Sequence, residues 1–332
     1  MKNIAIRGGA AIYELEPLPH TKRYIVTTPQ SRSICNDPLV FGVEYTNALR
    51  AGITDVFKMF REAGIEIAEE KHALILHILR GGLNYGIRDA LHDAYGWSNT
   101  SSAFISSQRV FTDKDGWQIS ENSYRKMPHI ADADVIFGDV VATGTSLKHA
   151  LAKLIEEKRV AGTSYRSLTF FTIGSEESEH ILEGAAAECA KFFPNFQGAR
   201  MIYIEGIFGV PAKDSSLSIA LQGTDLLRHP AELAPEFVES QKEAVSYALE
   251  RCTIYDAGSR AFEPHEYLTD VKDYWEKVEK LGAAGMSTYA YLQERFPVDA
   301  RLRDDAFKNG MSAAGSLQKI AEEQLTKLKT AL

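Results

Sequence analysis

One short segment of the chain combines an acid, a turn of small residues and several hydroxyl groups directly after an apolar run. The run covers residues 135–141 and carries Asp139 near its end, and the turn at 142–146 reads Ala-Thr-Gly-Thr-Ser. Apolar residues at helical spacing follow from Leu147. A strand–turn–helix of this kind directs backbone N–H groups and the positive end of a helix dipole at one spot, which favours an anion. The segment therefore predicts a phosphate site.

The side chains of this turn indicate which kind of phosphate ligand it could bind. The hydroxyls of Thr143, Thr145 and Ser146 can donate to one anion, and Asp139 can accept from a sugar hydroxyl or reach a metal ion. A Walker loop needs a Lys directly before its last hydroxyl residue, and Gly144-Thr145 has none. The segment favours a sugar phosphate over a nucleoside triphosphate.

A second anion-seeking segment follows the continuous apolar run at residues 73–79. It reads Arg80-Gly81-Gly82-Leu83. Glycines let the backbone approach a ligand closely, and the Arg adds a permanent positive charge. In an open α/β sheet, ligands sit beyond the carboxyl ends of the strands. We expect both segments to lie at that edge.

The rest of the pattern predicts the elements that position these segments. Apolar runs predict strands at 73–79, 103–107, 135–141, 167–174 and 200–210. Helical spacing predicts helices within 38–69, 147–157, 177–191 and 233–251. The alternation predicts an α/β fold with a parallel twisted sheet flanked by helices, and the polar stretch 111–128 predicts a long loop or hairpin. We divide the chain into an N-terminal arm or edge hairpin (1–35), an α/β domain (36–262) and a helical C-terminal extension (263–332).

The two anion-seeking segments resemble loops of the type I phosphoribosyltransferases. In that family an apolar strand, two acids and two apolar residues precede Thr-Thr-Gly-Thr-Ser, the loop that binds phosphoribosyl pyrophosphate (PRPP); here residues 138–146 read Gly-Asp-Val-Val-Ala-Thr-Gly-Thr-Ser. Residues 79–83, Leu-Arg-Gly-Gly-Leu, resemble the Leu-Arg-Ala-Gly-Leu diphosphate loop of uracil phosphoribosyltransferases.

Two further segments extend the resemblance to the uracil phosphoribosyltransferases. Residues 123–128, Ser-Tyr-Arg-Lys-Met-Pro, are similar to the Tyr-Tyr-x-Lys-Leu-Pro that precedes the family's PRPP loop. Residues 256–262, Asp-Ala-Gly-Ser-Arg-Ala-Phe, resemble its closing Gly-Asp-Ala-Gly-Asp-Arg-x-Phe-Gly. The four segments follow the family's order across about residues 25–262, with an insertion around 212–245, and the C-terminal helical part has no counterpart.

The resemblance implies transfer of 5-phosphoribosyl from PRPP to a nucleobase or related acceptor, with release of diphosphate. It implies Mg²⁺ as cofactor, and we expect a homodimer or a higher homo-oligomer. The loop expected to hold the 5′-phosphate consists of Ala142, Thr143, Gly144, Thr145 and Ser146. The groups expected at the ribose and the diphosphate are Asp139, Arg109, Arg80, Gly81 and Gly82. The residues expected to border the acceptor are Tyr255, Asp256, Gly258 and Arg260, with Glu205 and Gly206 at a strand end.

Two departures from the family pattern leave the acceptor open. Gly138 stands where the family has its first acid. The base-contacting loop, Pro-Gly-Leu-Gly in the family, is replaced by Arg-Cys-Thr-Ile-Tyr at 251–255, which should reshape the pocket that contacts a pyrimidine ring. Two other interpretations stay open. One is a non-catalytic regulator that binds PRPP or a nucleotide on the same fold, and the other is an unrelated α/β protein with a phosphate loop.

Composition excludes several classes of partner and site. The formal charge is −8 and no basic block occurs, so we expect neither nucleic acid nor an anionic membrane as a main partner. No segment approaches the ~20 apolar residues of a membrane span. The three cysteines, Cys35, Cys189 and Cys252, are far apart and lack CxxC spacing. They are typical of a reducing compartment, and we expect a cytoplasmic protein.

The remaining patterns predict packing. His72 and His77 lack metal-ligand spacing, and we expect core or surface roles for them. A helical aromatic stripe should pack on the α/β core, or form a subunit interface or a lid over the acceptor; it consists of Tyr267, Val271, Tyr274, Trp275, Val278 and Leu281.

Overall fold

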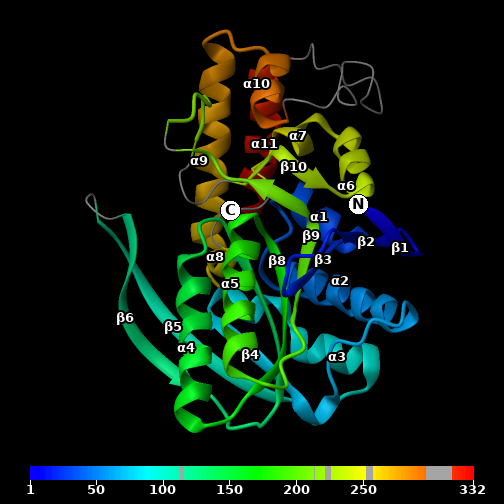
Figure 1. Cartoon of the computed structure of the whole chain (residues 1–332). Helices are drawn as coiled ribbons and strands as arrows, with labels where there is room; N and C mark the ends of the chain where they lie inside the picture. The colour runs from blue at the N-terminus through cyan, green and yellow to red at the C-terminus, as the bar shows by residue number, and fades with distance from the viewer. Residues whose placement is uncertain (113–115, 213, 221–225, 252–256, 297–315) are drawn as a thin grey trace.

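A twisted mixed sheet forms the centre of the computed structural model, with helices on both faces and a helical group above one edge (Figure 1). The structure describes residues 1–112, 116–212, 214–220, 226–251, 257–296 and 316–332, without the side chains of 107–112, 116–123 and 229–231. No helix among the described residues is long and apolar enough to cross a membrane.

The sheet confirms the predicted α/β class. Its strands run in the order β1-β2-β3-β9-β8-β7-β4-β5-β6, with β10 beside β9. The segment from β3 to β5 is parallel, and β1, β2, β6 and β10 are antiparallel additions. The strands are β1 (Lys2–Arg7), β2 (Ala10–Leu15), β3 (Thr21–Thr27), β4 (Ala73–Leu79), β5 (Ser101–Thr112), β6 (Gly116–Lys126), β7 (Ala133–Val141), β8 (Tyr165–Ser175), β9 (Ala199–Gly209) and β10 (Leu227–Leu233).

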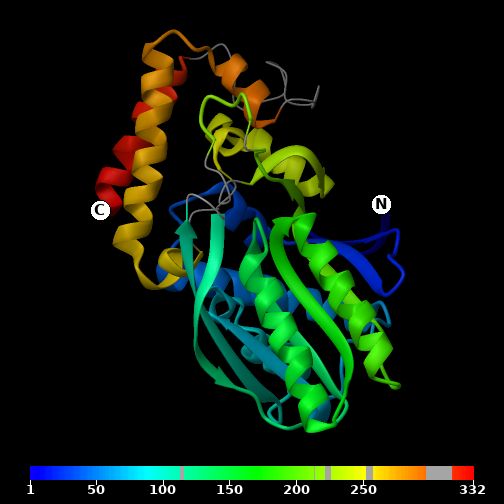
Figure 2. The ribbon, with the colours of Figure 1, turned by 60° about the vertical axis from the view of Figure 1, so that its left-hand side comes forward.

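The helices follow the crossover connections that a parallel sheet needs. α4 and α5 cover one face of the sheet and α2 and α3 the other, while α9 and α11 stand side by side away from it (Figure 2). The helices are α1 (Pro29–Asn36), α2 (Gly42–Glu62), α3 (Ile87–Tyr95), α4 (Thr145–Ala161), α5 (Glu177–Phe192), α6 (Pro235–Ser240), α7 (Val245–Leu249), α8 (Ala257–Phe262), α9 (Pro264–Ala283), α10 (Thr288–Arg295) and α11 (Leu317–Ala331). The short 3-10 turns are η1 (Glu70–His72), η2 (Gly81–Tyr85) and η3 (Gln241–Glu243).

Burial explains why the central strands read as uninterrupted apolar runs. Five of the seven residues of β4 and seven of the nine residues of β7 are buried, because helices cover both faces of the sheet. The predicted hairpin is confirmed, since β5 and β6 pair antiparallel from Phe104↔Lys126 to Thr112↔Gly116.

The N-terminal segment contains the expected edge hairpin, because β1 and β2 pair antiparallel at the end of the sheet, but its third strand lies inside the sheet. Residues 21–26 pair parallel with residues 199–204 of β9, and Tyr24, Ile25 and Val26 are buried in the main core. The apolar run of β3 is short and follows a proline-rich stretch, which hid its place inside the sheet.

The segment 233–251 also differs from the single helix that we expected. Its first residue ends strand β10, and the remainder breaks into α6, η3 and α7. Apolar residues of this region join the C-terminal helices in a second core, separate from the core of the sheet. The aromatic stripe, which we expected on the α/β core, packs in this second core instead: Tyr267, Val271, Tyr274, Trp275 and Val278 are buried, with Leu281 partly buried against them.

Candidate functional site

The two predicted anion-binding segments meet at one place because β4 and β7 are neighbours in the sheet. From β4 the chain continues through α3 to β5 on one side, and from β7 through α4 to β8 on the other. The connections therefore diverge between β4 and β7, beyond their carboxyl ends. Such a topological switch point is where open α/β sheets bind ligands.

The diphosphate loop of the sequence prediction is the 3-10 turn η2. A Cβ atom at Gly81 would lie 2.6 Å from Oδ1 of Asp139, and one at Gly82 would lie 3.0 Å from the carbonyl oxygen of Gly138. Both glycines are needed because the β4 loop lies directly against the end of β7. The structure thus brings Gly81, Gly82 and Asp139 together. The peptide bond between Leu79 and Arg80 is cis.

The predicted 5′-phosphate loop connects β7 to the N-terminus of α4. Gly144 is the N-cap residue, with φ +72°, and no side chain caps the helix among the described residues. The first amides of α4 therefore lack an intrahelical partner and face the loop. Thr143 is exposed, and Thr145 and Ser146 are half-buried. The unpaired amides at the start of α4, the dipole of this 17-residue helix and the accessible hydroxyls of the loop together favour a bound phosphate.

The aromatic ring of Tyr85 explains the missing first acid. A Cβ atom at Gly138 would lie 2.2 Å from Cδ1 of Tyr85. The Tyr85 hydroxyl donates to the carbonyl oxygen of Asp139 at 2.7 Å and accepts from the amide of Ile173 at 3.2 Å. Thr172 donates to the same carbonyl at 2.8 Å. The ring and these bonds fix the backbone of Asp139, in space that a side chain at position 138 would need.

The cations of the predicted diphosphate site are described only in part. Arg80 is exposed and its Nη2 lies 2.9 Å from Oε2 of Glu263, directly before α9. The Glu263 carboxyl consequently has a pKa below its ordinary value, because Arg80 donates to it. Arg109 lies on β5, and its side chain is outside the described residues.

Arg260 and Glu205, which we expected beside the acceptor, are both fully buried and make hydrogen bonds within the fold. The Arg260 side chain is fully buried, and its guanidinium donates to the carbonyl oxygens of Val40 at 2.7 Å and Asp37 at 2.9 Å. These bonds fix the connection between α1 and α2, so Arg260 stabilises the fold. Glu205 is also fully buried, and its Oε1 accepts from the amide of Thr28 at the start of α1.

The other predicted acceptor residues are placed only in part. Tyr255 and Asp256 lie outside the described residues. Gly258 is buried in α8, one residue after Ala257, whose carbonyl oxygen accepts from Nδ2 of Asn84 at 2.6 Å. This bond ties α8 to the diphosphate loop, so residues far apart in the sequence border the same site.

Sequence reasoning missed an open cavity of ≈530 Å³ beside the phosphate loop. Thr143 and Ala142 form one wall, and the ends of β8 and β9 form the others. Its remaining lining residues are Ser175, Glu176, Glu177, Ile207, Phe208, Gly209 and Val210. The signal existed in the sequence, because residues 167–177 also read as a strand, a turn and a helix start. The cavity is large enough for a planar base.

A magnesium ion fits this site only as a companion of a phosphorylated ligand. Among the described residues no three His, Cys, Asp or Glu side chains are grouped as a metal would need. Mg²⁺ commonly keeps several waters and binds one or two carboxylates together with substrate phosphates. Asp139, which lies against Gly81, would be the carboxylate available for such an ion.

Known protein structures resemble this chain only weakly, and no known sequence family matches it. The chain matches no protein-family model, and no curated protein sequence matches it. Two crystal structures of a hypoxanthine phosphoribosyltransferase from Staphylococcus aureus are similar, with 18% and 19% identity and TM-scores of 0.26 and 0.24. Each match covers 44% of this chain and 64% of that enzyme. A hypoxanthine-guanine-xanthine phosphoribosyltransferase is similar at 15% identity and a TM-score of 0.24, over 47% of this chain and 78% of that one.

Proposed function

We propose that this chain is a phosphoribosyltransferase, which transfers 5-phosphoribosyl from PRPP to a nucleobase or related acceptor and releases diphosphate. One observation carries the proposal. Two predicted anion-binding loops follow the neighbouring strands β4 and β7 at the switch point of the sheet, and the loop after β4 lies directly against Asp139 at the end of β7. PRPP has two anionic groups with a ribose between them, and this order matches the order of the loops.

Each group of the site has a role in the proposed reaction. The amides at the start of α4 and the hydroxyls of the loop, including Thr143, hold the 5′-phosphate. Asp139 accepts from the ribose hydroxyls. Arg80 and the backbone of η2 stabilise the negative charge that develops on the leaving diphosphate. The cavity at the ends of β8 and β9 holds the acceptor in line with the anomeric carbon.

Magnesium supplies charge neutralisation at the diphosphate and ribose oxygens when it accompanies PRPP. The protein contributes Asp139 to that arrangement. Catalysis then depends mainly on alignment and on charge complementarity, because the bond that breaks already has a good leaving group.

An assay of diphosphate release tests the proposal. The full chain is incubated with PRPP, Mg²⁺ and each of a panel of purine and pyrimidine bases, and free diphosphate is measured. We expect release with at least one base and a loss of at least tenfold in Asp139→Asn. No release with any base would contradict the transferase, and an undiminished rate in Asp139→Asn would contradict the site assignment.

A second candidate function is a regulator that binds PRPP or a nucleotide without turnover. The packing of Tyr85 over Gly138 favours it, since the first acid of the family pattern is absent and has no room to return. Saturable PRPP binding without diphosphate release across the panel would support this function over the enzyme.

A further inference from the structure

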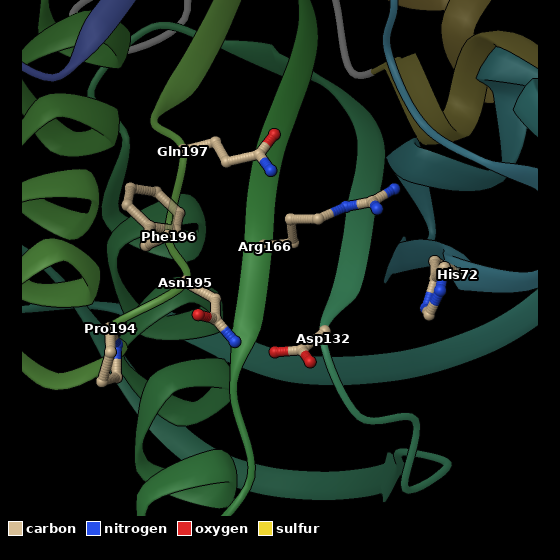
Figure 3. A pocket seen from close by; sticks show the side chains of 7 residues that line it. All are labelled: His72, Asp132, Arg166, Pro194, Asn195, Phe196 and Gln197. Carbon is tan, nitrogen blue, oxygen red and sulfur yellow. The ribbon is translucent and has the colours of Figure 1, made fainter.

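A second cavity lies at the opposite edge of the sheet from the proposed active site. It has a volume of ≈430 Å³ and opens at the amino ends of β4, β7, β8 and β9 (Figure 3). β7 alone has nine residues, which span roughly 30 Å at about 3.3 Å per residue. A ligand here therefore cannot touch the phosphate loop. We call this cavity the amino-edge cavity; its lining residues are His72, Asp132, Arg166, Pro194, Asn195, Phe196 and Gln197.

The arginine of the amino-edge cavity is already neutralised. Nε of Arg166 donates to both carboxylate oxygens of Asp134, at 3.0 and 3.1 Å, and Nη1 donates to Glu69 at 3.0 Å. Asp134 is buried and also accepts from the hydroxyl of Ser167 at 2.7 Å. Because two carboxylates compensate one guanidinium, the cavity has no excess positive charge to attract a phosphate or a carboxylate.

Asp132 gives the cavity a carboxylate that acts as a hydrogen-bond acceptor. Ser164 donates to its Oδ1. This bond, with smaller contributions from Asn195, His72 and Arg166, lowers the pKa of the Asp132 carboxyl, so it is ionised at neutral pH. Its backbone has φ +50°, a conformation in which Asp and Asn are among the tolerated residues. Figure 3 shows the Asp132 carboxylate and the Asn195 amide pointing toward each other.

The other lining groups suit a flat, polar ligand. Nδ1 of His72 is buried and has no hydrogen-bond partner among the described residues. The exposed amides of Asn195 and Gln197 offer donors and acceptors, and the half-buried ring of Phe196 offers an apolar surface. We do not propose a metal ion as the ligand of this cavity, because the described residues contain no group of three metal-binding side chains.

We propose that the amino-edge cavity binds a nucleobase or nucleoside that carries an amino group beside a ring N–H. An ionised carboxylate only accepts hydrogen bonds, and such a base edge presents two adjacent donors to its two oxygens. The amides of Asn195 and Gln197 pair with the remaining ring atoms, and the aromatic ring of Phe196 supports one face of the base. A phosphate on the ligand adds nothing, because the guanidinium is already paired. This inference does not depend on the proposed transferase activity.

A matched pair of nucleosides tests the assignment. Guanosine and inosine differ by one amino group, which lies beside the ring N–H. Calorimetry or ligand-detected NMR on the full chain measures both dissociation constants. We expect guanosine to bind roughly 5- to 100-fold more tightly than inosine, the discrimination typical of a two-point contact to a base edge, and guanosine monophosphate to bind no more tightly than guanosine.

Variants at the two edges of the sheet separate the amino-edge cavity from the proposed active site. Asp132→Asn, which keeps a side chain tolerated at positive φ, should abolish the preference for guanosine over inosine. Gln197→Ala, a substitution of an exposed residue, should weaken the binding of guanosine. Asp139→Asn at the opposite edge should leave the ratio of the guanosine and inosine dissociation constants unchanged, because the ribose that Asp139 is proposed to contact is the same in both nucleosides. Equal affinity for the two nucleosides, no binding to the wild type, or a preference unchanged in Asp132→Asn would overturn the proposal, whatever the outcome of the diphosphate assay.

Discussion

At the scale of single residues, the packing of Tyr85 against Gly138 separates this chain from the family pattern that its PRPP-like loop resembles. The ring occupies the space that a side chain at position 138 would need, and the hydroxyl holds the backbone of Asp139 at 2.7 Å. One large side chain therefore accounts for both the glycine at position 138 and the fixed position of Asp139.

Gly138→Ala should destabilise the protein by about 1–3 kcal/mol, because the new methyl group overlaps the Tyr85 ring in a packed core. Gly184→Ala is the matched control. Gly184 lies exposed in α5 with nothing within 4 Å of an added Cβ, so this change should stabilise by up to about 1 kcal/mol. Urea unfolding measures both, and equal effects of the two substitutions would refute the packing explanation.

The buried carboxyl of Glu205 should make the stability of the folded protein depend on pH. Burial raises the pKa of its carboxyl from 4.5 to about 7, although Ser31, Thr27 and Thr28 donate to it and Arg32 opposes the shift. The folded state therefore binds this proton more tightly than the unfolded state. The stabilisation that this proton gives the folded state is complete below about pH 4.5 and is lost as the pH rises through about 7.

Glu205→Gln removes the titration, so the comparison with wild type isolates it. The free energy of unfolding of wild type relative to Glu205→Gln should fall by on the order of 3 kcal/mol between pH 4.5 and pH 8. Urea unfolding at several pH values checks this expectation. Parallel pH profiles for the two proteins would contradict the buried, protonated carboxyl.

At the scale of elements, the start of α9 holds the proposed diphosphate loop. Glu263 pairs with Arg80 at 2.9 Å, and Asn84 of η2 donates to Ala257 of α8. An incoming diphosphate would compete with the Glu263 carboxylate for the same guanidinium. The helical extension therefore acts directly on the loop that we assign to the leaving group.

Glu263→Gln should strengthen binding of inorganic diphosphate roughly 2- to 5-fold, because an exposed ion pair contributes about 0.2–1 kcal/mol. Asp273→Asn, an exposed acid on the same helix, controls for the change in net charge. Calorimetric titration with diphosphate compares the two variants. An equal gain in both would show that net charge, rather than the contact with Arg80, is responsible.

The elements also show what the sequence could predict. Apolar runs located β4, β7, β8 and β9 closely because strands covered on both faces need uninterrupted apolar side chains. Their alternation with helices implied the parallel sheet, and the sheet order then brought the two anion loops together. Residue patterns could not reveal the role of Arg260, since its carbonyl partners lie more than 200 residues away and no local signal marks them.

At the scale of the whole molecule, two cores share the chain. The first belongs to the sheet, and the second combines Val238, Val245 and Leu249 with the helices after residue 263. The boundary that we placed at residues 262 and 263 therefore divides apolar residues that pack together. Residues before that boundary depend on the C-terminal helices for their burial.

A chain that ends at Phe262 should consequently expose apolar surface and unfold at lower denaturant concentration than the full chain. Binding of a hydrophobic dye and urea unfolding test this expectation. A truncated chain that is monodisperse, binds no dye and keeps the full stability would show that the second core is dispensable.

The most direct test of the central claim is a calorimetric titration of the full chain with PRPP in the presence of Mg²⁺. The account predicts saturable binding that weakens at least tenfold in Asp139→Asn and several-fold in Thr143→Ala, while Thr269→Ala, an exposed change on α9, leaves it unaltered. Absence of binding, or the same affinity in all four proteins, would contradict a PRPP site at the junction of β4 and β7.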